Sequence, residues 1–367
     1  MPVIPRALQP GQAIAFLSPS ERLNTVFEPA LLRAKAVFEA LGYPVKIFWT
    51  QGSSPRPTVT QSITHRIAEL VAAFSDPEVG AIICTIGGST ATELLPTLLR
   101  DKVVLKTLVD NPKIFVGYSD ITVIHWVLAA QTGLRTFYGP TVLPELGVAP
   151  APAAFDMDNL LRTITPAGRT TPGALPQSTQ YAPLQAPYFY GDPASMTPQA
   201  LAPTPSRKWL RGGPPSTGHL FGGCLPVVAR LHGIAGVAPD SWARKIMFLE
   251  TAFAEGSRFT AGFLLSNIRR ALADLAAAGI FEDIEGLVFG RCFGYDGTEQ
   301  RAELERVIVE ALAIGETGEK WGKRKEFPVL MHADFGHTDP MLTLPMGALA
   351  RLDAERDEFA ILEPTVV

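Results

Sequence analysis

The sequence predicts an α/β fold with a parallel sheet, because strand-like and helix-like stretches alternate in the first part of the chain. Short apolar runs of strand length are separated by longer stretches with helical apolar spacing. Strand, helix and strand in this order indicate a parallel sheet with helices on both faces. The predicted strands are residues 13–17, 45–48, 81–86 and 113–116, and the predicted helices are residues 29–41, 63–74 and 121–131.

Three of these predicted strands end in small, polar or glycine residues, at positions 18–20, 87–90 and 117–120. The carboxyl ends of parallel strands meet at one edge of a sheet, and α/β folds bind their ligands beyond that edge. We therefore expect the functional site at this edge.

The chain divides into an N-terminal domain at residues 1–145, a connecting segment at 146–217 and a C-terminal α/β domain at 218–367. The connecting segment is rich in proline, but it also holds several aromatic residues, which favours an ordered substrate-facing segment over a flexible linker. In the C-terminal domain we predict helices at 225–231, 263–277 and 302–313, strands at 245–249, 284–289 and 329–332, and further β structure at 343–345 and 348–352.

Composition limits the classes of function. The chain has 367 residues, 47% of them hydrophobic, and a formal net charge of −4, which is typical of a soluble globular protein and does not favour a nucleic-acid partner. Residues 1–11 lack the pattern of a secretory signal, and no apolar run reaches membrane-spanning length. Three scattered cysteines without CxxC spacing indicate reduced thiols in the cytoplasm.

Residues 113–120, with the sequence KIFVGYSD, predict a buried strand, a glycine turn and a serine at the start of a helix. The hydroxyl of Ser119 would then lie near free backbone N–H groups, which favour developing negative charge. Ser119 is therefore a candidate nucleophile. The alternative is that Ser119 and Asp120 only cap the helix.

A hydroxyl nucleophile needs a base, and the base needs a group that orients it. Glu250 follows an apolar strand, and His337 lies in a glycine turn after another strand. We predict a triad in which Ser119 attacks, His337 acts as general base and then acid, and Glu250 holds the imidazole. The backbone N–H groups of Gly88 and Asp120 are the candidate donors of an oxyanion hole.

The sequence is also compatible with other assignments. His65, His125, His219 and His232 compete with His337 as the base, because spacing alone does not separate them. The segment around Ser119 lacks the second glycine of the α/β-hydrolase elbow, although serine, glutamate and histidine follow one another in that fold's order. No cysteine and histidine spacing fits a zinc site, and no P-loop follows the glycines at 87–88.

Six motifs, in order and from residue 11 to about 353, resemble those of the serine LD-carboxypeptidases, and they are closest to the branch that contains the microcin C self-immunity proteins. The motifs are IICTIGG at 82–88, FVGYSDIT at 115–122, TFYGP at 136–140, GHLFGG at 218–223, FLET at 248–251 and FGH at 335–337.

This resemblance implies a Rossmann-like N-terminal domain with the nucleophile and a smaller C-terminal α/β domain with the glutamate and the histidine. The active site would lie at the interface between the two domains. It also implies a cytoplasmic homodimer without a metal or an organic cofactor. Members of the family cut the amide between an L- and a D-centre in murein tetrapeptides, or the acyl–nucleotide linkage of toxic aminoacyl-adenylate mimics.

Two departures from the family pattern bear on the substrate. After the double glycine the chain has Ser89, Thr90 and Glu93 as candidate substrate contacts, and the arginine of murein carboxypeptidases is missing at that turn. Cys224 stands where the family commonly has asparagine. In the immunity branch an aromatic insertion stacks on a nucleoside base, and the residues here that could do so are Tyr188, Phe189, Tyr190 and Trp209.

The leading hypothesis is a serine hydrolase that cleaves an amide or acyl-nucleotide bond, as a detoxifying peptidase similar to the microcin C self-immunity proteins. One alternative is an LD-carboxypeptidase of murein tetrapeptides. The other is a non-catalytic homologue that only binds a ligand, although the intact serine, glutamate and histidine argue against it.

The proposed base predicts a pH dependence. Activity falls on the acidic side, because a protonated His337 no longer accepts the serine proton. A pH–rate profile that stays flat from about pH 5 to 8 would argue against a histidine base.

Overall fold

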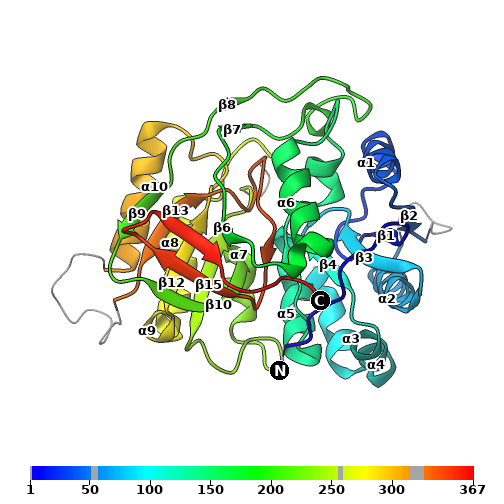
Figure 1. Cartoon of the computed structure of the whole chain (residues 1–367), viewed down its shortest axis with the longest axis horizontal. Helices are drawn as coiled ribbons and strands as arrows, with labels where there is room; N and C mark the ends of the chain where they lie inside the picture. Colours follow the sequence, from blue (N-terminus) through cyan, green and yellow to red (C-terminus); the bar gives the residue numbers. More distant parts are fainter. Residues whose placement is uncertain (1, 51–56, 255–258, 314–325) are drawn as a thin grey trace.

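The computed structural model describes residues 2–50, 57–254, 259–313 and 326–367. It has a mixed α/β fold in which two sheets lie side by side, each with its own helices (Figure 1). The first sheet has six strands in the order β14-β5-β4-β3-β1-β2, and the second has eight in the order β6-β16-β15-β10-β11-β12-β13-β9. Within the described ranges, no helix is long and apolar enough to cross a lipid bilayer.

Five strands of the first sheet are parallel, as the sequence predicted. These strands are β1 (Ala13–Leu17), β2 (Val45–Phe48), β3 (Val79–Cys84), β4 (Ile114–Gly117) and β5 (Phe137–Tyr138). All of them except β2 are nearly completely buried, because helices cover both faces of the sheet, whereas β2 lies at its edge and is only partly buried.

The helices of the N-terminal domain pack in two layers. One layer buries side chains of α2 (Val59–Ser75), α3 (Leu95–Arg100), α4 (Lys102–Asp110) and α5 (Thr122–Thr132) against one face of the sheet. The other face is covered by α1 (Glu28–Ala40) and α6 (Ala154–Ile164).

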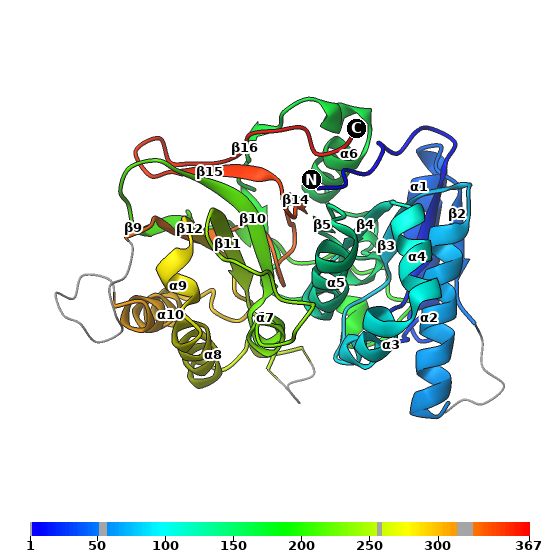
Figure 2. The same ribbon diagram turned by 90° about the horizontal axis from the view of Figure 1, so that it is seen from below.

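The second sheet has a parallel centre and antiparallel edges. Its central strands are β10 (Ser216–Cys224), β11 (Lys245–Glu250), β12 (Gly286–Gly290) and β13 (Val329–Ala333). The antiparallel strands are β15 (Leu349–Asp353), β16 (Glu358–Ile361), β6 (Gly173–Ala174) and β9 (Lys208–Arg211). Figure 2 shows α7 (Leu225–Leu231), α8 (Leu265–Ala277) and α10 (Thr298–Ala311) on one side of this sheet, with the short α9 (Ile280–Asp283) near its edge.

The connecting segment at 146–217 contains regular structure where the sequence predicted no helix or strand. It contains the helix α6, whose buried Met157, Leu160 and Ile164 belong to the core of the N-terminal domain. It also supplies β6 and β9 at the two edges of the second sheet, and β7 (Gln180–Tyr181) pairs with β8 (Ala202–Pro203). The segment is thus built into both domains.

One C-terminal strand lies in the N-terminal sheet. The sequence predicted β structure at 343–345, in the region assigned to the C-terminal domain, but β14 (Leu344–Pro345) pairs antiparallel with β5. The short length of the strand explains why the sequence alone does not show its partner. Because β14 closely follows residues 335–337, this pairing ties the loop that carries His337 to the N-terminal sheet.

The two domains share one hydrophobic core, which contains Trp126 of α5 and Phe248 of β11. The indole N–H of Trp126 donates to the carbonyl of Gly222 at 2.8 Å, and the backbone N–H of Cys224 donates to the hydroxyl of Thr122 at 3.1 Å. At Gly222 a Cβ would lie 1.8 Å from the carbonyl oxygen of Phe248, so only glycine fits this close approach of β10 and β11. The shared core and the two hydrogen bonds between α5 and β10 fix the relative position of the domains.

Candidate active site

Ser119 lies where β4 ends and α5 begins. It has a φ of 62°, in the left-handed region that L-residues other than asparagine and aspartate rarely adopt, and it opens a short 3₁₀ turn, Ser119–Ile121. A Cβ at Gly87 would lie 2.8 Å from the Cβ of Ser119, so the neighbouring strand-end turn needs a glycine there. Strained backbone of this kind concentrates at functional sites, at a cost of about 1–3 kcal/mol.

Ser119, His337 and Glu250 form one chain of hydrogen bonds. The Oγ atom of Ser119 lies 3.0 Å from Nε2 of His337, and Nδ1 of His337 lies 2.6 Å from Oε2 of Glu250. The backbone N–H of His337 also donates to Oε2 of Glu250, at 3.2 Å. At Gly336, which has a φ of 95°, a Cβ would lie 2.5 Å from the Cβ of Glu250, so this turn can approach the carboxylate only with glycine.

The carboxylate of Glu250 is completely buried. Burial by itself raises the pKa of this group, but His337 and the hydrogen bonds from Tyr138 and Cys224 outweigh it, so the pKa of Glu250 is lowered. Glu250 is therefore a carboxylate at neutral pH. In that form it accepts the Nδ1 proton of His337 and leaves Nε2 as the acceptor toward Ser119.

Tyr138, at the end of β5, connects the serine and the glutamate by a second route. Its hydroxyl donates to Oε1 of Glu250 at 2.6 Å and accepts the backbone N–H of Ser119 at 3.1 Å. Burial, followed by the charge of Glu250, raises the pKa of Tyr138 well above its ordinary value, so the hydroxyl keeps its proton. Sequence reasoning did not select Tyr138, although it lies in the TFYGP motif at 136–140.

Two aromatic rings hold the imidazole of His337. The rings of Tyr118 and Phe253 lie edge-on to it, with centroid distances of 5.0 and 4.8 Å. The Tyr118 hydroxyl in turn donates to Glu145 at 2.7 Å, and burial raises the pKa of Glu145 to about 8. These neighbours limit rotation of the ring, so that Nε2 stays directed at the serine.

The three strand ends singled out in the sequence meet around Asp120. Its carboxylate accepts hydrogen bonds from the Ser20 hydroxyl at 2.7 Å and from the backbone N–H of Ala91 at 2.8 Å, and it pairs with Arg230 at 3.1 Å. Asp120 and Gly88, the candidate oxyanion-hole residues, both line the cavity that Ser119 faces. Their role as donors stays a prediction.

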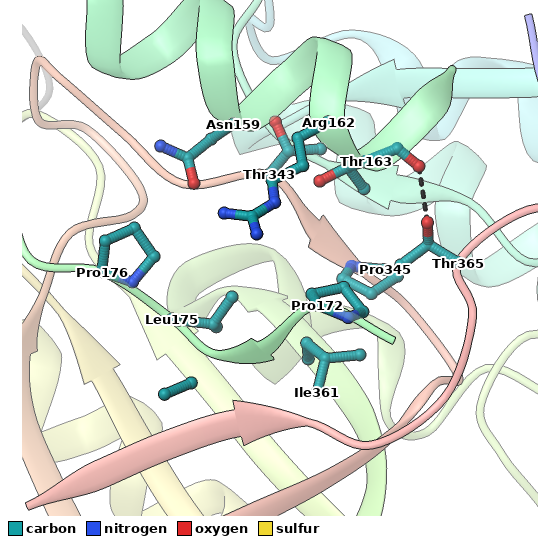
Figure 3. A pocket seen from close by; sticks show the side chains of 11 residues that line it. Asn159, Arg162, Thr163, Pro172, Leu175, Pro176, Thr343, Pro345, Ile361 and Thr365 are labelled. Atoms are coloured by element: carbon teal, nitrogen blue, oxygen red, sulfur yellow. Dashed lines mark hydrogen bonds between the residues drawn. The ribbon is translucent and has the colours of Figure 1, made fainter. Parts of the chain in front are cut away.

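This cavity has a volume of about 610 Å³ and lies between the two domains. The N-terminal domain contributes its strand-end turns, and the C-terminal domain contributes α7 and the segment that follows β11. A volume of this size is sufficient for a small organic ligand. Figure 3 shows a different pocket, between α6 and the segments around Pro345 and Ile361, which has a volume of only about 20 Å³ and so holds no more than a water molecule.

Only some of the candidate substrate contacts lie at the large cavity. Ser89 and Phe189 line it. Thr90 and Glu93 are bound instead by the buried guanidinium of Arg66.

Three of the four predicted aromatic contacts lie elsewhere. Tyr190 is exposed, and its hydroxyl donates to the carbonyl of Phe259 at 2.9 Å. Tyr188 is buried in the N-terminal core, where its hydroxyl donates to the carbonyl of Pro144 at 3.1 Å. Trp209 is on the edge strand β9 and donates to Asp357 at 2.8 Å. Neither lines the cavity, because packing within each domain uses their rings.

The competing histidines have other positions. His125 is buried, with Nδ1 at 2.8 Å from the Thr136 hydroxyl and Nε2 at 2.8 Å from the Gly117 carbonyl, and burial lowers its pKa to about 4. It is thus a neutral residue that supports β4. Of the six histidines in the sequence, all within the described ranges, His337 alone lines the cavity.

Among the residues that the structure describes, one group of side chains has the geometry to hold a metal ion. The ligand atoms of Cys224, Glu250 and His337 lie within 4.8 Å of one another. However, Glu250 and His337 are already hydrogen-bonded to each other, and burial raises the pKa of the Cys224 thiol well above its usual value, which disfavours the thiolate that metals bind. That the enzyme works without a metal stays a prediction.

The hydrogen-bond chain runs from a serine through a histidine to a buried glutamate, at the edge of a parallel sheet and beside a cavity. This arrangement is typical of serine peptidase-type hydrolases. Residues 14–139 match the LD-carboxypeptidase N-terminal domain, and residues 217–352 match the LD-carboxypeptidase C-terminal domain. The chain belongs to this family, peptidase S66, and is a hydrolase of the serine carboxypeptidase type.

Similar proteins match over nearly the full length. A "putative carboxypeptidase" of Vibrio cholerae is 28% identical over 367 residues, covering 97% of this chain and 96% of its own. The microcin C7 self-immunity protein MccF of Escherichia coli is 24% identical over 362 residues, covering 99% of this chain and 96% of its own. The structure of MccF with aspartyl sulfamoyl adenosine has a TM-score of 0.81 at 23% identity and covers 100% of both chains, which shows the shared fold.

The bridging hydroxyl of Tyr138 generates a prediction. Replacement Tyr138→Phe lowers kcat by about 10- to 100-fold with little change in KM, because it removes a hydrogen bond to a charged group that positions the base rather than the substrate. Steady-state kinetics on the purified variant measure this change. The matched control is Tyr43→Phe, at a buried tyrosine outside the cavity, and an unchanged kcat in the Tyr138 variant would contradict the positioning role.

Proposed function

We propose that the protein is a serine hydrolase that cleaves an amide or acyl-nucleotide bond, with Ser119 as the nucleophile, His337 as the base and Glu250 as the orienting group. The observation that carries this proposal is the continuous hydrogen-bond chain from Ser119 through His337 to Glu250, which ends at a cavity of about 610 Å³.

In the proposed mechanism, Nε2 of His337 takes the hydroxyl proton as Oγ of Ser119 attacks the carbonyl carbon of the substrate. The N–H groups of Gly88 and Asp120 stabilise the tetrahedral oxyanion. The imidazolium then gives its proton to the leaving group, and an acyl-enzyme ester remains on Ser119. A water molecule, deprotonated by the same histidine, hydrolyses the ester and restores the serine.

Two observations favour an acyl-nucleotide substrate. The fold is that of MccF, which has been crystallised with an aspartyl sulfamoyl adenosine. Phe189 lines the cavity and stacks on Phe27, with ring centroids 4.7 Å apart, so an aromatic surface is available to a nucleoside base. A detoxifying peptidase of the microcin self-immunity kind is therefore the first candidate.

An LD-carboxypeptidase of murein tetrapeptides is the second candidate. Its substrate has a free terminal carboxylate, and Arg230 gives the cavity one cation that can bind such a group. The alternative of a protein that only binds its ligand is less well supported, since all three triad side chains are in hydrogen-bond contact.

The compartment and the assembly belong to the same proposal. All three cysteines are buried and unpaired, in agreement with a reducing cytoplasm. A homodimer is expected from the family resemblance, and gel filtration with light scattering tests it.

Replacement Ser119→Ala tests the function directly. We expect it to lower turnover by about 10⁴-fold or more, because the histidine and glutamate cannot act without the nucleophile. Purified protein is incubated with a murein tetrapeptide that ends in a D-residue and, separately, with an aminoacyl sulfamoyl adenosine, and the products are identified by mass spectrometry. Serine-dependent cleavage of the adenosine compound supports the first candidate, and serine-dependent release of the D-amino acid supports the second.

The matched control is Ser241→Ala, at an exposed serine outside the cavity. Full activity of the Ser119 variant would reject the assignment of the nucleophile. Binding without turnover by the unmodified protein would favour the non-catalytic alternative.

A further inference from the structure

The cavity beside Ser119 has few charges in its wall. Apart from His337, the ionisable carboxyl and guanidinium groups among its described lining residues are those of Glu21, Asp120 and Arg230. Arg230, on the last turn of α7, is thus the single lysine or arginine among the described residues that line the cavity.

Asp120 does not use up the hydrogen-bonding capacity of Arg230. Nη2 of Arg230 lies 3.1 Å from Oδ1 of Asp120, while Oδ2 of Asp120 already accepts from Ser20 and from the backbone of Ala91. The guanidinium has five N–H donors, and within the described structure no hydrogen bond involves Nε or Nη1. The side chain of Arg230 is 49% exposed, whereas that of Asp120 is 1% exposed.

The pairing with Asp120 also places the arginine. Asp120 directly follows Ser119, and its carboxylate is fixed by donors from two other strand ends. The guanidinium is therefore bound to the residue that follows the proposed nucleophile in the sequence, and its other N–H donors are available to a ligand.

Most of the remaining wall is apolar. On the C-terminal side it consists of Pro226, Val227, Phe253, Phe259 and Phe263 among others. A ligand that fills this cavity can bury an apolar body there, but a negative charge on it needs a cation, since burying an unpaired charge is costly.

We propose that Arg230 binds an anionic group of the substrate, a carboxylate or a phosphoryl-type group, next to the bond that Ser119 attacks. The planar guanidinium fork matches both groups, because each presents two oxygens to parallel N–H donors. The reaction at this site rests on the proposed function, whereas anion binding by Arg230 does not require turnover.

Isothermal titration calorimetry on the Ser119→Ala protein tests the proposal without catalysis. Two ligand pairs differ only in the anionic group: a short peptide ending in D-alanine against its carboxamide, and adenosine monophosphate against adenosine. In the Ser119→Ala background, adding Arg230→Gln weakens the binding of at least one anionic ligand by about 10- to 100-fold. The neutral partner of that ligand binds within about twofold of its former affinity.

The comparison within each pair separates a ligand contact from a structural role. If Arg230 only supported Asp120, both members of a pair would lose affinity equally, and this result would overturn the proposal. The same holds if the variant binds the anionic ligands as tightly as its parent, or if the parent binds neither anionic ligand at millimolar concentration. The pair that responds identifies the source of the anion, a terminal carboxylate or a nucleotide phosphate.

Two further variants complete the design. Arg230→Lys keeps the charge but loses the fork, so it restores part of the lost affinity. Arg356→Gln removes an exposed arginine that lies outside the cavity and leaves all four affinities unchanged. If no substrate is hydrolysed by the unmodified enzyme, the proposed function fails, while the calorimetry still decides the role of Arg230.

Discussion

The carboxylate of Glu250 lies buried between the two domains and accepts hydrogen bonds from both sides. The Tyr138 hydroxyl reaches it from the N-terminal domain, and the backbone and side chain of His337 reach it from the C-terminal part of the chain. A buried charge is tolerated only when it is well satisfied, and removal of one partner from such a group typically costs several kcal/mol. The geometry around Glu250 therefore fixes the imidazole and, through Tyr138, the backbone of Ser119. The rest of the site depends on this one group.

A site divided between two domains works only if the domains do not move relative to each other. Here a single hydrophobic core crosses the boundary, and Trp126 and Thr122 of α5 bond to the backbone of β10. Gly223 permits this approach, since a Cβ at that position would lie 2.5 Å from the side chain of Thr122. Strand β14, which closely follows His337 in the sequence, adds a second connection at the edge of the N-terminal sheet. The packing thus supplies the precision that a nucleophile and its base need.

The fold class and the parallel strands could be predicted because apolar periodicity is a local signal. Ser119, Glu250 and His337 could be selected because each follows a strand at the edge where α/β folds place ligands. Tyr138 was missed, since its importance lies in a hydrogen bond to a residue more than a hundred positions away. Trp209 and Tyr188, by contrast, were selected from the sequence but do not line the cavity. An aromatic residue near a predicted site has no local mark that tells a ligand contact from a core residue, and their positions were decided by packing. Helix α6 was overlooked because its apolar positions lie in a proline-rich and alanine-rich stretch.

The proposed chemistry requires that His337 activates the hydroxyl of Ser119. An alkyl fluorophosphonate forms a stable phosphonyl ester with an activated serine, and mass spectrometry of the labelled, digested protein locates the adduct. We expect one adduct, on the peptide that contains Ser119, and a large loss of labelling in the His337→Gln variant. Labelling of another serine such as Ser20, or equal labelling of Ser119 with and without His337, would contradict it.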